Sequence, residues 1–226
     1  MGGSPWEDLA PVGICYDLVD SSAGHRLDPV AGTVGLRGAT LDTMDQRIVN
    51  GWLEAARRVP SPNFDERPAG TEIDLLVVHG ISLPPGEYGG DWIDAFFTNC
   101  LDPDAHPYFR SICTLRVSAH LLIRRNGELI QYVPFDKRAW HAGESRFDGR
   151  TACNDFSIGV ELEGCDDQAY DGRQYRALAD LARVLMTAYP GITTERIVGH
   201  CDIAPQRKTD PGQAFEWPRL YTLLRE

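Results

Sequence analysis

Short apolar runs that end in chemically active side chains constrain the fold of this chain more than any other feature. Residues 73–79 (IDLLVVH) form a β-branched apolar run that ends in His79. Residues 196–200 (RIVGH) form a shorter run that ends in a second histidine, His200. A third run, FSIGVELEG at 156–164, alternates and ends in two carboxylates. Runs of this length and composition predict buried strands, so we expect a sheet with polar groups at its strand ends.

Segments between and after these runs predict helices and a hairpin. The apolar spacing of residues 172–190 predicts an amphipathic helix that stops at a proline. Residues 91–99 and 215–226 are candidates for shorter helices, and 118–135 reads as a hairpin around an Asn-Gly turn. Strands and helices mix without strict alternation. The fold class that we expect is therefore α/β, a single domain with a central mixed β-sheet flanked by helices.

The first 43 residues differ from the rest of the chain. The 226 residues suffice for one sizeable core, but residues 1–43 are rich in Gly, Asp, Ala and Ser and lack an amphipathic period. Two interpretations stay open. The segment is a disordered extension, or it is not native and Met44 is the natural start. Either way, we expect the folded domain to span residues 44–226.

Charge and cysteine content argue against several classes of partner and indicate the compartment of the protein. A formal net charge of −11 with scattered basic residues argues against nucleic acid as a partner and against attraction to an anionic membrane. No apolar run approaches the roughly 18 residues that span a bilayer, and the N-terminus lacks a secretory signal pattern. The six cysteines include no CxxC pair. We therefore expect reduced thiols in a cytoplasmic protein.

Two histidines and a carboxylate form a candidate metal site. His79 and His200 end predicted strands, and Asp210 follows ten positions after His200. Two histidines and one carboxylate are a common catalytic zinc set that leaves the fourth position open. Spacing alone is weak evidence, because residues this far apart meet only through the fold. The alternative for each histidine is an ordinary core or surface role.

Glu161 and Lys208 are candidates for catalytic roles beside such a metal. Strand alternation places Glu161 and Glu163 on one face, with Leu162 opposite. A carboxylate in the site could take a proton from water, and a fixed cation such as Lys208 could stabilise an oxyanion. The alternatives are a solvated carboxylate pair at a strand end and an ordinary surface lysine.

Five segments together carry a family resemblance: LLVVHGISLPPGEYGG, FTNCLDPDAHPYFR, LRVSAHLLIRRNGELIQYVPFDKRAWHAG, CNDFSIGVELEG and GHCDIAPQRKTDPG. In this order they resemble the AmpD family of cytoplasmic 1,6-anhydro-N-acetylmuramyl-L-alanine amidases. That family belongs to a wider group of zinc amidases that includes the peptidoglycan recognition proteins. The resemblance covers about Gly51 to Leu224, and it implies a peptidoglycan recognition protein/AmpD-like fold.

The resemblance also implies the metal and the catalytic residues. One Zn²⁺ per chain would be bound by His79, His200 and Asp210. Glu161 would act as the general base and Lys208 as the cation that stabilises the oxyanion. Peptidoglycan recognition amidases use cysteine as the third ligand, so Asp210 agrees with the AmpD type.

The implied substrate contacts are accompanied by two departures from the family pattern. Arg116 would hold the stem-peptide carboxylates, and Trp140 and His141 would line the groove. The family commonly has asparagine where this chain has Gly80, and arginine where it has Ala152. Losing a charge-assisted contact at position 152 would cost roughly 1.5–3 kcal/mol. These departures bear on stem-peptide preference rather than on the chemistry.

The function implied is zinc-dependent hydrolysis of the amide between (1,6-anhydro-)N-acetylmuramic acid and L-alanine in muropeptide recycling. The substrate would be a soluble anhydro-muropeptide and the protein a monomer. Two other classes stay open: an amidase that acts on intact peptidoglycan, and a non-catalytic muropeptide sensor. The Pro/Gly-rich loop at residues 81–90 is the candidate for motion near the site.

Overall fold

A computed structural model describes residues 47–226, so the interpretations of residues 1–43 and of Met44 lie outside the described residues. Within this part of the chain no helix is both long and apolar enough to cross a bilayer. The elements in chain order are β1 (Ile48–Val49), β2 (Trp52–Leu53), β3 (Arg57–Arg58), β4 (Phe64–Asp65), β5 (Leu75–Ile81), α1 (Trp92–Phe97), α2 (Phe109–Ile112), β6 (Leu121–Ile123), β7 (Leu129–Gln131), β8 (Arg138–Ala139), β9 (Arg146–Phe147), β10 (Arg150–Thr151), η1 (Cys153–Asp155), β11 (Ser157–Glu163), α3 (Gly172–Ala188), η2 (Thr194–Arg196), β12 (Ile197–Gly199), α4 (His200–Ile203) and α5 (Trp217–Leu224).

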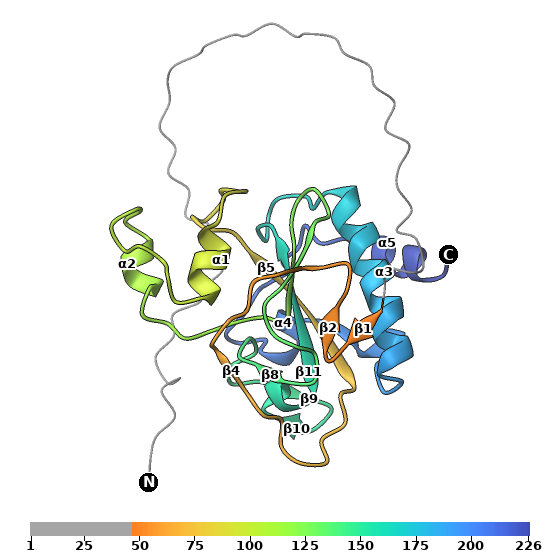
Figure 1. Cartoon of the computed structure of the whole chain (residues 1–226). Coiled ribbons are helices and arrows are strands. Elements are labelled where there is room, and N and C mark those ends of the chain that lie inside the picture. The colour runs from red at the N-terminus through yellow and green to blue at the C-terminus, as the bar shows by residue number, and fades with distance from the viewer. Residues whose placement is uncertain (1–46) are drawn as a thin grey trace, which may run out of the picture.

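A six-stranded sheet in the order β12-β5-β11-β6-β7-β3 forms the centre of the fold. The pairs β12/β5, β5/β11, β11/β6 and β7/β3 are parallel, whereas β6 and β7 form an antiparallel hairpin. The sheet is therefore mixed, and helices flank it (Figure 1). The predicted fold class, a single domain with a central mixed sheet, is confirmed.

One face of the sheet packs against α3 and α5. Leu76, Val78 and Val160 point to this face and join the buried cluster that contains Leu178 and Leu181 of α3. The 17 residues of α3 bury one side of the helix, as its apolar spacing predicts. The even-numbered apolar residues of β5 and β11 thus belong to the core, and the odd-numbered residues face the other way.

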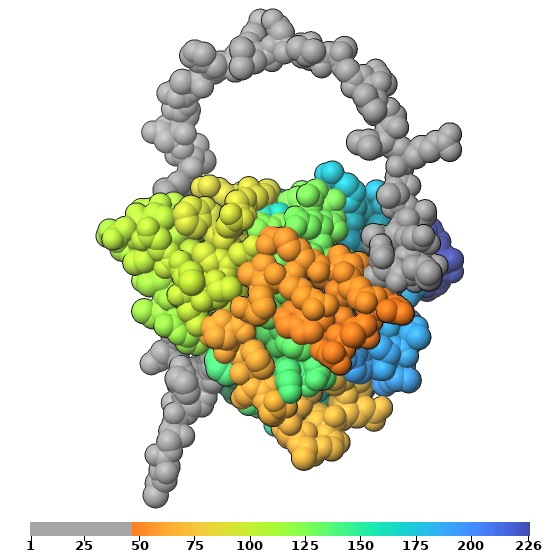
Figure 2. All heavy atoms as spheres, viewed as in Figure 1, coloured from red at the N-terminus to blue at the C-terminus, as the bar shows by residue number. Residues whose placement is uncertain are grey.

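The second face is covered in part by α1 and α2. Their aromatic side chains Phe96, Phe97 and Phe109 pack with Leu122 and Tyr132 of the β6–β7 region. In Figure 2 the first described segment, drawn in orange, crosses the surface between the α1–α2 region and α3.

Strand register brings the candidate residues together. In the parallel β5–β11 pair His79 lies opposite Glu161, and in the β5–β12 pair Val78 lies opposite Gly199. His200, directly after Gly199, therefore lies beside His79. Because the carboxyl ends of parallel strands meet at one edge of a sheet, residues distant in sequence gather there.

His200 opens a short helix rather than closing a strand, which differs from the prediction. The strand β12 ends at Gly199, whose N–H donates to the Asp202 carboxylate at 2.7 Å, and Ala204 N–H donates to the His200 carbonyl at 3.0 Å. The polar side chain at 202 thus caps a new turn locally. The predicted final helix also starts later, at Trp217, because Phe215 is buried in the core.

Candidate active site

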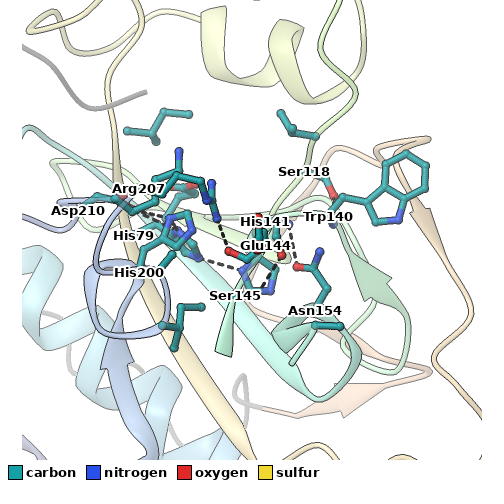
Figure 3. A pocket seen from close by; sticks show the side chains of 18 of the residues that line it. His79, Ser118, Trp140, His141, Glu144, Ser145, Asn154, His200, Arg207 and Asp210 are labelled. Atoms are coloured by element: carbon teal, nitrogen blue, oxygen red, sulfur yellow. Dashed lines mark hydrogen bonds and ion pairs between the residues drawn. The ribbon is translucent and has the colours of Figure 1, made fainter. Parts of the chain in front are cut away.

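Three buried side chains converge at the carboxyl edge of the sheet. The Nδ1 atoms of His79 and His200 lie 3.0 Å apart, and each lies 3.1 Å from Oδ2 of Asp210. Figure 3 shows the three side chains pointing toward one another. Loop residue Asp210 is held against α4, because its backbone carbonyl accepts a hydrogen bond from Cys201 N–H at 2.9 Å.

This donor set fits a metal ion. Two imidazole nitrogens and a carboxylate oxygen within 4.8 Å of one another form a group that could hold a metal. Zinc–ligand bonds of about 2.0–2.1 Å in a tetrahedron place neighbouring ligands about 3.3 Å apart, close to the separations found here. The other carboxylate oxygen of Asp210, Oδ1, is buried without a hydrogen-bond partner, which is costly in a site that lacks a cation.

The protonation states of these groups also suit metal binding. Burial lowers the pKa of His79 to about 4, with the neighbouring His200 acting in the same direction. The pKa of Asp210 is also lowered: burial acts against ionisation, but its hydrogen bonds and proximity to His200 and His79 outweigh it. Neutral imidazole and ionised carboxylate are the forms that bind metals.

Glu161 faces the same site from β11. Its pKa is raised well above the usual value of a carboxyl, first by burial and then by the nearby Asp210 carboxylate, while Lys208 opposes the shift. Its Oε2 is buried without a hydrogen-bond partner. A carboxyl with a raised pKa and a free oxygen aimed into a pocket suits general acid–base chemistry near neutral pH.

Lys208 completes the charged centre. Burial lowers its pKa, and Asp210 and Glu161 counteract the shift. Its backbone N–H donates to Ala204 O at 2.9 Å, so the loop is tied to α4. A cation held beside two carboxylates retains its charge and can meet a developing oxyanion.

The far sides of both histidine rings are held by one short segment. His79 Nε2 lies 2.9 Å from Nδ1 of His141, whose Nε2 lies 3.1 Å from the Ser157 hydroxyl. His200 Nε2 donates to the Ala142 carbonyl at 3.2 Å. His141, predicted to line the groove, does line the pocket, but its ring also contacts a candidate ligand.

A pocket of about 1330 Å³ surrounds the centre. Seven of the eight predicted site residues line it, Trp140 among them, and only Arg116 does not. Arg116 is exposed, and its guanidinium donates to the backbone carbonyls of Cys113 and Leu115. Trp140 donates from its indole N–H to Asp65 at 3.2 Å on the pocket wall, where Arg138 also pairs with Asp65.

The first of the two departures from the family pattern has a local structural explanation. A Cβ at Gly80 would collide with the Tyr170 hydroxyl, which donates to Pro211 O at 2.9 Å directly after Asp210. Ala152 has a left-handed backbone, with φ of 58°, and lines the pocket. At both positions the chain presents little side chain to the pocket.

Sequence reasoning missed the residues that support the ligands. Asn154 accepts hydrogen bonds from the backbone N–H groups of His141 and Ala142 at 3.1 and 2.8 Å. Arg207 donates to the Ala142 and Glu144 carbonyls at 2.6 and 2.7 Å. These contacts use backbone atoms, which no residue pattern reveals. The available signal was the position of Asn154 and Arg207 within two of the five segments.

Residues 69–213 match the family model described as N-acetylmuramoyl-L-alanine amidase. The match includes every predicted site residue.

Individual relatives agree. The chain is 63% identical over 174 residues to the 1,6-anhydro-N-acetylmuramyl-L-alanine amidase AmpD of Salmonella typhimurium, covering 77% of this chain and 92% of that protein. A crystal structure of a selenomethionine AmpD derivative matches with a TM-score of 0.77 at 61% identity, over 79% of this chain and 99% of that one. The amidase AmiD of Escherichia coli, solved with anhydro-N-acetylmuramic acid-L-Ala-D-γ-Glu-L-Lys, matches with a TM-score of 0.50 at 30% identity, over 71% and 65% of the two chains.

Proposed function

The chain belongs to the N-acetylmuramoyl-L-alanine amidase family, and we propose that it is a zinc-dependent enzyme of cytoplasmic muropeptide recycling. It hydrolyses the amide between the lactyl group of (1,6-anhydro-)N-acetylmuramic acid and the L-alanine of the stem peptide. The observation that carries this proposal is the convergence of three candidate ligand atoms at 3.0–3.1 Å beside the free buried oxygen of Glu161.

His79, His200 and Asp210 would hold the zinc. When bound, zinc supplies a Lewis acid that lowers the pKa of water and polarises the scissile carbonyl. Glu161 takes the proton of the attacking water, and it returns a proton to the leaving amine. Lys208 stabilises the negative charge that develops on the carbonyl oxygen.

The pocket suits a ligand that joins a sugar to a short peptide. Its volume of about 1330 Å³ exceeds that of a site for a single small ring. Trp140 on the wall offers an aromatic surface to a sugar or peptide. The AmiD ligand carries free carboxylates on its peptide, and a stem peptide of this kind needs cations near the pocket.

Two arginines could meet these carboxylates. We keep Arg116 as the predicted contact, although it lies outside the pocket lining. Arg146, at the start of β9, lines the pocket and is exposed, and its guanidinium has no hydrogen bond or ion pair to any residue between Arg47 and Glu226. Its charge is therefore available to an anionic substrate.

Product analysis by mass spectrometry tests this function. Purified protein is mixed separately with anhydro-muramyl tripeptide and with intact sacculi, each with and without a chelator. We expect free tripeptide from the soluble substrate, release that stops when the chelator removes the metal, and little release from sacculi.

The other outcomes contradict the proposal in different ways. Release from sacculi at a similar rate would assign the protein to the amidases of intact peptidoglycan. No cleavage of either substrate by protein that contains zinc would support a muropeptide sensor.

A further inference from the structure

We propose that the segment His141–Ala142, clamped by Asn154, is the outer support that orients both histidine ligands of the metal. His141 is then a positioning residue rather than a simple contact to substrate. This inference rests on the metal centre of the proposed function, and it concerns how strongly and in what geometry that metal is held.

The first half of the support is a chain of side chains behind His79. Because Nδ1 of His79 points at Asp210 and His200, its lone pair must be free for the metal, and the ring proton belongs on Nε2. That proton faces Nδ1 of His141 at 2.9 Å, which must accept it. The remaining proton of His141 then lies on Nε2, 3.1 Å from the hydroxyl of fully buried Ser157.

The second half uses the backbone of the next residue. The Ala142 carbonyl accepts from His200 Nε2 at 3.2 Å, which leaves Nδ1 of His200 free for the metal. Both ligand rings are thus fixed in the same tautomer by adjacent residues of one segment. Partners of this kind orient ligand histidines and raise their basicity.

The support is itself held in place. Asn154 Oδ1 accepts from the N–H groups of both His141 and Ala142, at 3.1 and 2.8 Å. Gly159 on β11 makes room for the imidazole, because a Cβ there would overlap the His141 ring. The ring is therefore confined between the sheet and the pocket, with a hydrogen-bond partner at each nitrogen.

Zinc affinity measured without substrate tests the proposal. The zinc dissociation constant is determined by competition with a chromogenic chelator for the wild type, His141→Ala and His141→Asn. We expect His141→Ala to weaken binding about 10- to 100-fold, as is typical when a partner of a ligand histidine is lost. His141→Asn, whose Oδ1 can replace the acceptor near Nδ1, should recover much of the affinity.

The visible absorption of the cobalt-substituted protein gives a second readout, because it reports ligand geometry. His141→Ala should alter the cobalt spectrum, whereas His106→Ala should leave both readouts unchanged. His106 is the matched control, since it lies outside the pocket and its Nδ1 accepts from Tyr108 N–H at 3.2 Å.

Unchanged zinc affinity and an unchanged cobalt spectrum in His141→Ala would overturn the proposal and return His141 to the role of a substrate contact. If that variant does not fold, Ser157→Ala tests the same chain, and wild-type affinity there overturns the proposal. A protein that shows these zinc effects yet releases no peptide would contradict the proposed function and leave this inference intact.

Discussion

At the scale of single residues, the environment of Glu161 carries the proposed chemistry. Its carboxyl is placed opposite His79 by strand register, and burial raises its pKa so that it can exchange protons near neutral pH. Sequence alternation predicted which face Glu161 occupies, but not its lack of a hydrogen-bond partner. That property depends on the neighbouring side chains of Tyr170, Lys208 and Asp210, which come from other parts of the chain.

Glu161→Gln should abolish most turnover without releasing the metal. The amide keeps the size of the side chain but cannot take a proton, so we expect kcat to fall about 10²- to 10⁴-fold. Zinc content is measured on the same preparation, and Glu144→Gln serves as the control because Glu144 is an exposed carboxylate on the pocket wall. A Glu161→Gln variant with full turnover would remove this residue from the mechanism.

Comparing the KM of the Arg146→Ala and Arg116→Ala variants shows which arginine contacts the stem-peptide carboxylates. A charge-assisted hydrogen bond contributes roughly 1.5–3 kcal/mol, so loss of the arginine that meets the substrate should raise KM by about 10-fold or more. We expect the larger effect for Arg146, because it lines the pocket. A substrate whose peptide carboxylates are amidated is the control, and its KM should respond little. Equal KM values for both variants and the wild type would exclude both arginines.

His120 makes stability depend on pH. Burial, with the neighbouring Arg67 guanidinium, lowers the pKa of its imidazole to about 3, whereas the pKa of a histidine in the unfolded chain is about 6.5. The unfolded state therefore binds the proton first. The contribution of His120 to the free energy of unfolding is fully present above about pH 6.5 and is lost as the pH falls toward about 3.

In His120→Asn the free energy of unfolding should consequently fall less between pH 7.5 and pH 5 than in the wild type. Urea unfolding of metal-free protein at both pH values measures this difference. The asparagine can still accept the hydrogen bond that Gly159 N–H donates to Nδ1 at 3.0 Å. An equal fall in both proteins would mean that His120 is not the residue that titrates.

At the scale of elements, long patterns were predictable and short ones were not. The apolar spacing of 172–190 predicted α3, and the run at 73–79 predicted β5, because each buries one whole face. The two-residue strands β4 and β8, which carry Asp65 and Arg138 at the pocket wall, have no period to detect. The same holds for His200, where one capping carboxylate turned a strand end into a helix.

The N-terminus of α3 should depend on its capping box. Asp171 accepts from Arg173 N–H at 2.9 Å, and Gln174 accepts from Asp171 N–H at 3.0 Å. Asp171→Ala should lower the free energy of unfolding by about 1 kcal/mol, measured by urea denaturation of the zinc-loaded protein. Asp167→Ala, at an exposed loop position, should change it little. Equal values for the two variants would show that the cap does not limit stability.

At the scale of the whole molecule, the fold explains why distant residues meet. Three parallel strands end at one edge, and the loop that follows α4 returns Lys208 and Asp210 to that edge. The candidate ligands and catalytic residues could be proposed from family resemblance, since five segments carry them. Their outer partners could not, because Ala142 accepts through its backbone carbonyl and Asn154 accepts from the backbone N–H groups of other residues.

Zinc titration of the metal-free protein is the most direct test of the central claim that His79, His200 and Asp210 hold the catalytic metal. Bound zinc and release of peptide from anhydro-muramyl tripeptide are measured together as zinc is added. The account predicts that both rise in proportion and saturate at one zinc per chain. The Asp210→Ala variant should neither bind zinc nor release peptide. Full turnover by protein that contains no zinc, or by Asp210→Ala, would contradict it.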